Sequence, residues 1–141
     1  MTDPIARTSA GEVRGRREDG LDVFRGIPFA EPPVGELRFA APRPTSAWAG
    51  LRDAVEFGPP PPQDVGGFRD RLPPDWDPVA RERDRPGDWL TVNVWTPSAS
   101  AGAASARPVI VWIHGGAYKW ARPIPPAMTP SGSPGTAMWW W

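Results

Sequence analysis

The sequence predicts part of an α/β fold, in which small antiparallel strands at the amino terminus precede the first strands of a main sheet. Leu90, Val92 and Val94 alternate with Thr91, Asn93 and Trp95, the two-residue period of a half-buried strand. Residues 109–113 then form an unbroken apolar run between Pro108 and His114. Runs of this kind are typical of a strand that is buried on both faces of an α/β sheet.

The elements before these strands are predicted from turn residues and prolines. Residues 11–25 are expected to contain a β-hairpin with Asp19-Gly20 at its tip, because this dipeptide readily takes the positive φ angles of a tight turn. Residues 26–44 contain five prolines, so we expect an extended, irregular loop that packs on the protein. Its expected apolar anchors are Ile27, Phe29, Leu37 and Phe39.

Three further segments are expected to be irregular. Residues 53–63 end in four consecutive prolines, which we interpret as a stiff connector, although a polyproline ligand for a partner is the alternative. Residues 64–87 are predicted to be a surface excursion with at most a short helix at 79–83. Residues 98–106 contain only Ser, Ala and Gly, so they are predicted to be a flexible surface connection.

Composition excludes several classes of function. The chain has 141 residues, the size of one domain, and its 16 basic residues balance 16 acidic ones, so no net field would attract nucleic acid or anionic lipid. The absence of cysteine excludes disulfides and a cysteine nucleophile. One histidine and scattered acids give no metal-ligand spacing, and no cofactor is expected. With no signal-like or membrane-length apolar segment, we expect a cytoplasmic protein of unknown oligomeric state.

An ordered set of motifs between about residue 8 and residue 120 carries a resemblance to a known family. The motifs are GEVRG at 11–15, FRGIPFA at 24–30, PPVGELRF at 32–39, WAG at 48–50, FGP at 57–59, DWLTVNVWTP at 88–97 and VWIHGGA at 111–117. In content and order they resemble the type-B carboxylesterase and cholinesterase-like family of α/β-hydrolases. Family members often carry a cysteine before the LTLNVW-like strand, whereas Gly87-Asp88-Trp89 stands here, which favours a bacterial intracellular member.

The resemblance implies hydrolysis of small-molecule carboxylic esters by a serine, histidine and acid triad. In such enzymes backbone N–H groups of a glycine-rich loop stabilise the oxyanion. The matching loop here consists of Gly115, Gly116 and Ala117, with His114 shaping it rather than acting as the base. If the resemblance is set aside, the two glycines simply turn the chain after a strand.

The catalytic triad itself is not found in the sequence. No serine stands in a G-x-S-x-G elbow, and residues 131–135 resemble one only superficially. We therefore expect this chain to be an N-terminal part of a serine esterase that is inactive alone. The alternatives are a non-catalytic interaction module that binds through its Pro-rich and Trp-rich segments, and an unfolded remnant.

The pattern changes after Trp120, and we predict no secondary structure for residues 121–141. Fifteen of the 16 basic residues are arginine, which is typical of a GC-rich gene. If one G is restored after the Trp120 codon, compatible codons can read G-A-T-D-P-A-x-x-D-P-E-R-L-A-R-D-G-D-V-V-V, which resembles the family's continuation. We therefore expect residues 8–120 to be the N-terminal part of a carboxylesterase domain, and residues 121–141 to be an aberrant tail produced by a frameshift.

Overall fold

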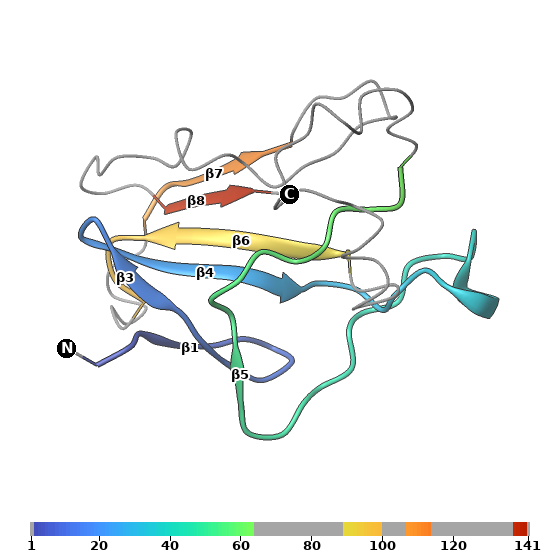
Figure 1. Ribbon diagram of the computed structural model, residues 1–141, viewed down its shortest axis with the longest axis horizontal. Coiled ribbons are helices and arrows are strands. Elements are labelled where there is room, and N and C mark those ends of the chain that lie inside the picture. The colour runs from blue at the N-terminus through green and yellow to red at the C-terminus, as the bar shows by residue number, and fades with distance from the viewer. Residues whose placement is uncertain (1, 64–88, 100–106, 114–136, 141) are drawn as a thin grey trace, which may run out of the picture.

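The structure, a computed structural model, contains two β-sheets and describes residues 2–63, 89–99, 107–113 and 137–140 (Figure 1). A three-stranded sheet has the order β1-β2-β5, and a five-stranded sheet has the order β3-β4-β6-β8-β7. The bounds are β1 Ile5–Arg7, β2 Glu12–Arg14, β3 Arg16–Glu18, β4 Leu21–Pro28, β5 Leu51–Asp53, β6 Thr91–Thr96, β7 Val109–Trp112 and β8 Ala137–Trp140, with a short 3-10 helix at Gly35–Leu37.

The predicted hairpin is confirmed. Strands β3 and β4 pair antiparallel and Glu18 lies opposite Leu21, so Asp19 and Gly20 alone form the turn. Their φ angles are 47° and 81°. Two successive positive φ angles define the turn whose twist matches that of the flanking strands, which explains why an Asp-Gly pair occurs here.

A β-bulge interrupts β4 at Arg25 and Gly26. Phe24 pairs with Val94 and Ile27 with Val92, so β4 contains one residue more than β6 in this interval. Gly26 has a φ of 68°, and a Cβ there would lie 2.7 Å from the backbone oxygen of Glu56, so no other residue fits without a shift of the backbone. The extra residue bends the strand and turns the Arg25 side chain into a new direction.

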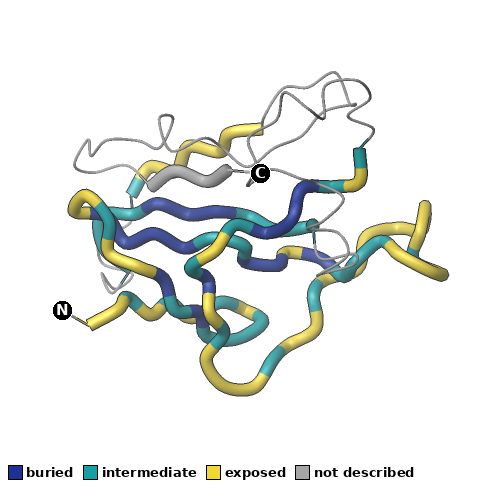
Figure 2. The backbone as a smooth tube through the Cα atoms, viewed as in Figure 1, coloured by how far each residue is buried: buried dark blue, intermediate teal, exposed yellow. Residues whose placement is uncertain are grey.

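Strands β4 and β6 carry the core, because both of their faces are covered (Figure 2). On the face toward the three-stranded sheet, Val13 packs with Phe24, Ile27, Ala54 and Val94. On the opposite face Leu21, Val23 and Trp95 form a second cluster, against which Phe57 packs. Successive residues of a strand point to opposite faces, so each of the two strands contributes to both clusters.

The prediction that residues 90–96 and 109–113 belong to one sheet is confirmed, but the prediction that they are neighbouring strands is wrong. Strand β8 lies between β6 and β7, antiparallel to the first and parallel to the second. The prediction of no secondary structure for residues 121–141 is therefore wrong for Ala137–Trp140. Tryptophan is enriched in strands, and β8 has backbone pairing partners on both sides, β6 and β7. The division of the chain at residue 120 stays a prediction.

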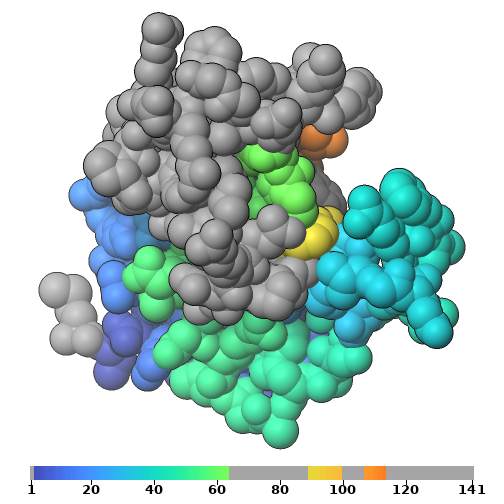
Figure 3. Space-filling model, turned by 45° about the vertical axis from the view of Figure 1, so that its right-hand side comes forward, coloured from blue at the N-terminus to red at the C-terminus, as the bar shows by residue number. Residues whose placement is uncertain are grey.

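The expected burial of two apolar segments is also wrong. All residues of 109–113 are between 48% and 76% exposed, and β7 is also the last strand of the described sheet. Phe39 is 94% and Phe29 37% exposed, so neither is a buried anchor of the loop of residues 29–43. This loop projects from the body of the molecule in Figure 3. Ile27, by contrast, is buried as expected.

Two other expectations have different outcomes. Pro59 and Pro60 are buried, so this part of the polyproline segment packs inside the protein and does not present a ligand surface. The short helix expected at 79–83 and most of the connection expected at 98–106 lie outside the described residues.

Candidate functional site

The predicted oxyanion loop follows directly on β7. His114, Gly115, Gly116 and Ala117 themselves lie outside the described residues, which reach Ile113 in this part of the chain. Strand β7 runs parallel to β8, so the loop begins at the carboxyl ends of two parallel strands. In open α/β sheets, ligands bind outside the carboxyl ends of the strands. The described structure thus places the start of the loop where such a sheet has its site.

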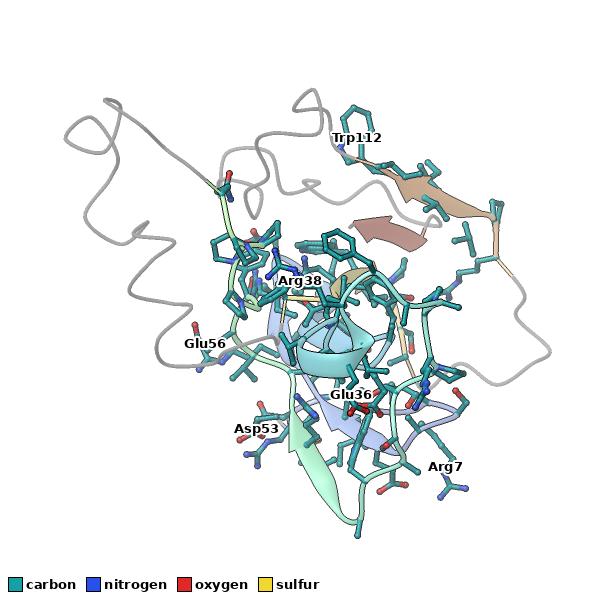
Figure 4. The ribbon with its side chains drawn as sticks, turned by 90° about the vertical axis from the view of Figure 1, so that its right-hand side faces the viewer. Arg7, Glu36, Arg38, Asp53, Glu56 and Trp112 are labelled. Carbon is teal, nitrogen blue, oxygen red and sulfur yellow. The ribbon has the colours of Figure 1, made fainter. Side chains whose placement is uncertain are left out.

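The end of β7 is accessible from solvent. Trp112 is 50% exposed and lies at the periphery of the molecule in Figure 4, and Ile113, the next residue, is 76% exposed. Solvent therefore reaches both residues at this end of β7. Access alone does not give chemistry, because a hydrolase also needs a nucleophile and a base.

The best-defined charged cluster among the described residues is formed around an ion pair at the bulge of β4, between Arg25 and Glu18. The Arg25 guanidinium donates two hydrogen bonds to the Glu18 carboxylate, at 2.7 and 2.6 Å. The same guanidinium lies over the ring of Phe57, 4.9 Å from its centroid, and near that of Trp95 at 5.9 Å. The hydrogen bonds from Arg25, aided by its charge and against partial burial, lower the pKa of Glu18. A carboxylate held ionised in this way is a poor general acid, so the cluster is structural.

A buried carboxylate, that of Asp22, joins three segments. Asp22, with a side chain only 7% exposed, accepts hydrogen bonds from Arg17 at 2.5 Å and from the backbone N–H of Ala99 at 2.7 Å. Arg17 also donates to the backbone oxygen of Pro97. These contacts attach the end of β6 to the hairpin β3–β4. Asp22 was not singled out from the sequence, and its place in a strand between apolar residues was the available signal.

A cavity of about 730 Å³ opens beside the larger core cluster. Val13, Phe24, Ile27 and Val94 form its apolar floor, and hydroxyl-bearing residues such as Thr8 line it as well. None of the described lining residues belongs to β7. The described lining contains hydroxyls and one arginine but neither a histidine nor a carboxylate, so no described residue of the cavity could act as a base toward a serine or threonine there.

The described residues also limit other chemistries. Among them no group of three or more histidine, cysteine or acidic side chains could hold a metal ion. Their helices include none with the length and apolar character needed to span a bilayer.

Comparison with known proteins identifies the family. Residues 2–126 match the profile of the carboxylesterase family. The chain is 51% identical over 117 residues to phenmedipham hydrolase of Pseudarthrobacter oxydans, and 39% identical over 118 residues to para-nitrobenzyl esterase of Bacillus subtilis (strain 168). These matches cover 82% and 84% of this chain and 22% of each relative. The chain therefore belongs to the carboxylesterase family, and it spans about 22% of the length of these relatives.

Solved structures agree with this assignment. A para-nitrobenzyl esterase structure superimposes on 98% of the chain with a TM-score of 0.71 and 32% identity, and 26% of that structure is covered. The carboxylesterase of Geobacillus stearothermophilus gives a TM-score of 0.68 at 32% identity, with 95% of this chain and 25% of that one covered. The two sheets described above are thus part of an α/β-hydrolase fold.

Proposed function

We propose that this chain supplies the amino-terminal strands and the oxyanion-hole loop of a carboxylic ester hydrolase. The observation that carries the proposal is the position of β7, which ends at Trp112 beside the carboxyl end of the parallel strand β8. In the sequence, Gly115, Gly116 and Ala117 begin three residues after Trp112. Family membership over residues 2–126 supports the same role, because this range includes the whole loop.

The proposed chemistry is stabilisation of negative charge. When a nucleophile attacks an ester carbonyl, the carbonyl oxygen becomes an oxyanion, and backbone N–H groups held in place donate hydrogen bonds to it. Glycine suits such a loop because the backbone approaches the substrate closely. The loss of one donor of this kind raises the barrier by about 2.7–4 kcal/mol, which lowers kcat by about 10²–10³.

The nucleophile and the base must come from elsewhere in a complete enzyme, so we propose that these 141 residues alone do not hydrolyse esters. Oxyanion donors without a nucleophile form no acyl-enzyme. The described lining of the cavity beside Phe24 supports this proposal, because it offers hydroxyls but neither a histidine nor a carboxylate. Phenmedipham and para-nitrobenzyl esters, which appear in the names of two relatives, are the first substrates to test.

A chimaera tests the proposed role of the loop. Residues 8–120 of this chain would replace the matching part of the Bacillus subtilis para-nitrobenzyl esterase, to which the chain is 39% identical. We expect the chimaera to hydrolyse a para-nitrobenzyl ester and Gly116→Pro, which removes one backbone N–H, to lower kcat by about 10²–10³. Gly35→Ala is the control: a Cβ there would meet no atom within 4 Å, and the strain from its φ of 55°, about 1–2 kcal/mol, arises outside residues 115–117. Equal activity of the Gly116→Pro and Gly35→Ala chimaeras would refute the proposal.

A further inference from the structure

Strand β7 is the part of the described fold with the least cover. It is the last member of the order β3-β4-β6-β8-β7, so one of its edges pairs with β8 while the other faces no described strand. Figure 1 shows β7 as the outermost strand on this side of the sheet. An edge strand exposes unpaired backbone N–H and C=O groups to any further strand that can bind there.

Both faces of β7 are exposed as well as its edge. Val109, Ile110, Val111 and Trp112 are 55%, 48%, 56% and 50% exposed. Successive side chains of a strand point to opposite faces, so a strand covered on one side would show alternating exposure. The near-equal values therefore mean that the two faces are exposed to the same degree, and that neither is packed as the faces of β6 are. In β6 of the same sheet, Val94 and Trp95 point to opposite faces and are both buried (Figure 2).

The chemistry of β7 does not match that of a protected edge. Natural edge strands carry charged residues or prolines that prevent further pairing. The sequence Val-Ile-Val-Trp contains no polar residue, which is typical of a parallel strand that lies between two layers of helices. Strand β7 pairs with β8 in parallel. Further parallel strands at the open edge would be joined by crossover connections, whose helices pack on the faces of the sheet.

The comparisons with solved structures indicate which polypeptide could cover β7. The chain superimposes on 98% of its length with a para-nitrobenzyl esterase structure, yet it covers 26% of that structure. About three quarters of such an α/β fold is thus left to cover the two faces and the edge.

We propose that β7 is a docking surface for the remainder of a carboxylesterase fold, and that this chain binds that remainder when it is offered as a separate polypeptide. The inference extends the proposed function, because a complex formed in this way would unite the loop at 115–117 with a nucleophile and a base. Binding requires only the apolar strand and its edge, so it does not depend on the oxyanion role of Gly116.

The probe is the part of the Bacillus subtilis para-nitrobenzyl esterase that follows the region matched here. Co-expressed with the 141-residue chain, it is expected to co-elute with it in size-exclusion chromatography. Ile110→Asp, on β7, is expected to weaken binding at least about 10-fold, because a charge would enter an apolar interface. Ile5→Asp on β1 is the matched control, since Ile5 is 50% exposed and Ile110 is 48% exposed, and it should change binding less than twofold.

A second measurement does not require the two polypeptides to fold separately. A protease site placed after residue 120 in the chimaera, where the two parts join, allows the enzyme to fold whole and to be cut afterwards, and we expect the two pieces to stay together in native buffer. Separation of the cut pieces would overturn the inference, as would equal effects of Ile110→Asp and Ile5→Asp. A homodimer of the chain that excludes the probe and that Ile110→Asp dissolves would also overturn it, since the occupant would then be a second copy.

Activity distinguishes this inference from the proposed function. A stable complex of the two polypeptides without esterase activity retains the docking surface and contradicts the role of the loop. An uncut chimaera that is active, but whose two pieces separate after cutting, retains the role of the loop and contradicts the docking surface.

Discussion

Replacement of Arg25 by alanine tests what holds the bulge of β4 in place. The side chain of Arg25 is 12% exposed, and it makes two hydrogen bonds to Glu18 and lies over the Phe57 ring. Hydrogen bonds to charged groups contribute about 1.5–3 kcal/mol, and a cation–π contact about 0.5–1 kcal/mol. Glu18 is 37% exposed and can rehydrate, which offsets part of the loss. We therefore expect Arg25→Ala to lower the free energy of unfolding by about 2–3 kcal/mol.

Circular dichroism measured over a series of urea concentrations gives this free energy of unfolding by linear extrapolation to zero urea. Arg7→Ala is the matched control, because Arg7 also pairs with a glutamate but is 83% exposed; it should cost less than about 0.5 kcal/mol. Should Arg25→Ala fail to fold, Arg25→Lys, which keeps the charge but not the paired hydrogen bonds, should show roughly half of the loss. Equal stabilities of the Arg25→Ala and Arg7→Ala chains would refute the reasoning.

Three other predictions concern the same described core. Gly15→Ala should lower the free energy of unfolding by about 2–3 kcal/mol, because its Cβ would meet a backbone carbonyl oxygen. Gly20→Ala would meet only open space, but its φ of 81° should cost about 1 kcal/mol. Urea unfolding compares the two variants. Trp48→Phe keeps an aromatic ring, though a smaller one, but loses the 3.0 Å hydrogen bond of the indole N–H to Glu12. A loss of about 1 kcal/mol in the free energy of unfolding is expected, and a larger loss would point to packing of the indole ring. The folded-state pKa of Glu18 is lowered, so its contribution is complete above its ordinary pKa of 4.5 and is lost as the pH falls through the folded value. The stability gap between the wild-type chain and Glu18→Gln should therefore narrow below pH 4.5, and a constant gap would contradict this.

Local sequence signals predicted those parts of the fold that depend on few residues. The Asp19-Gly20 pair defines its turn whatever the rest of the chain does, and the alternation through Val92 and Val94 is enough to indicate β6. The bulge at Gly26 could not be predicted in this way. It depends on the side-chain oxygen of Asn93, which accepts a hydrogen bond from the Gly26 N–H at 2.9 Å across 67 residues.

The order of the strands was beyond local signals for a related reason. Three-residue strands such as β5 show no period of their own, and β5 exists through its parallel pairing with β2. Strand β8 likewise forms between β6 and β7, where both neighbours offer backbone partners. For the site, the sequence indicated the oxyanion loop at Gly115 and Gly116 by resemblance. The resemblance specified residues, while the positions of the donor groups depend on tertiary contacts that lie outside the described residues.

Phe39 presents the clearest conflict between residue type and position. Its φ of 60° lies in the left-handed region, which costs a bulky L-residue about 1–2 kcal/mol. Phe39 is 94% exposed, so burial offsets almost none of this cost, and the Arg38 guanidinium lies 5.3 Å from the centroid of its ring. An exposed contact of this kind contributes about 0.5 kcal/mol. The balance predicts that asparagine, which tolerates the left-handed region, is the better residue here.

Phe39→Asn should therefore stabilise the chain by about 0.5–1 kcal/mol in urea unfolding, against the usual direction of point mutations. Asparagine is preferable to glycine for this test because it adds less freedom to the unfolded chain. Arg38→Ala is the control, since it removes the cation–π contact and leaves the backbone at Phe39 unchanged, and it should cost no more than about 0.5 kcal/mol. A loss of stability in Phe39→Asn larger than that in Arg38→Ala would mean that the ring packs on the chain in solution, and the argument from strain would then be wrong.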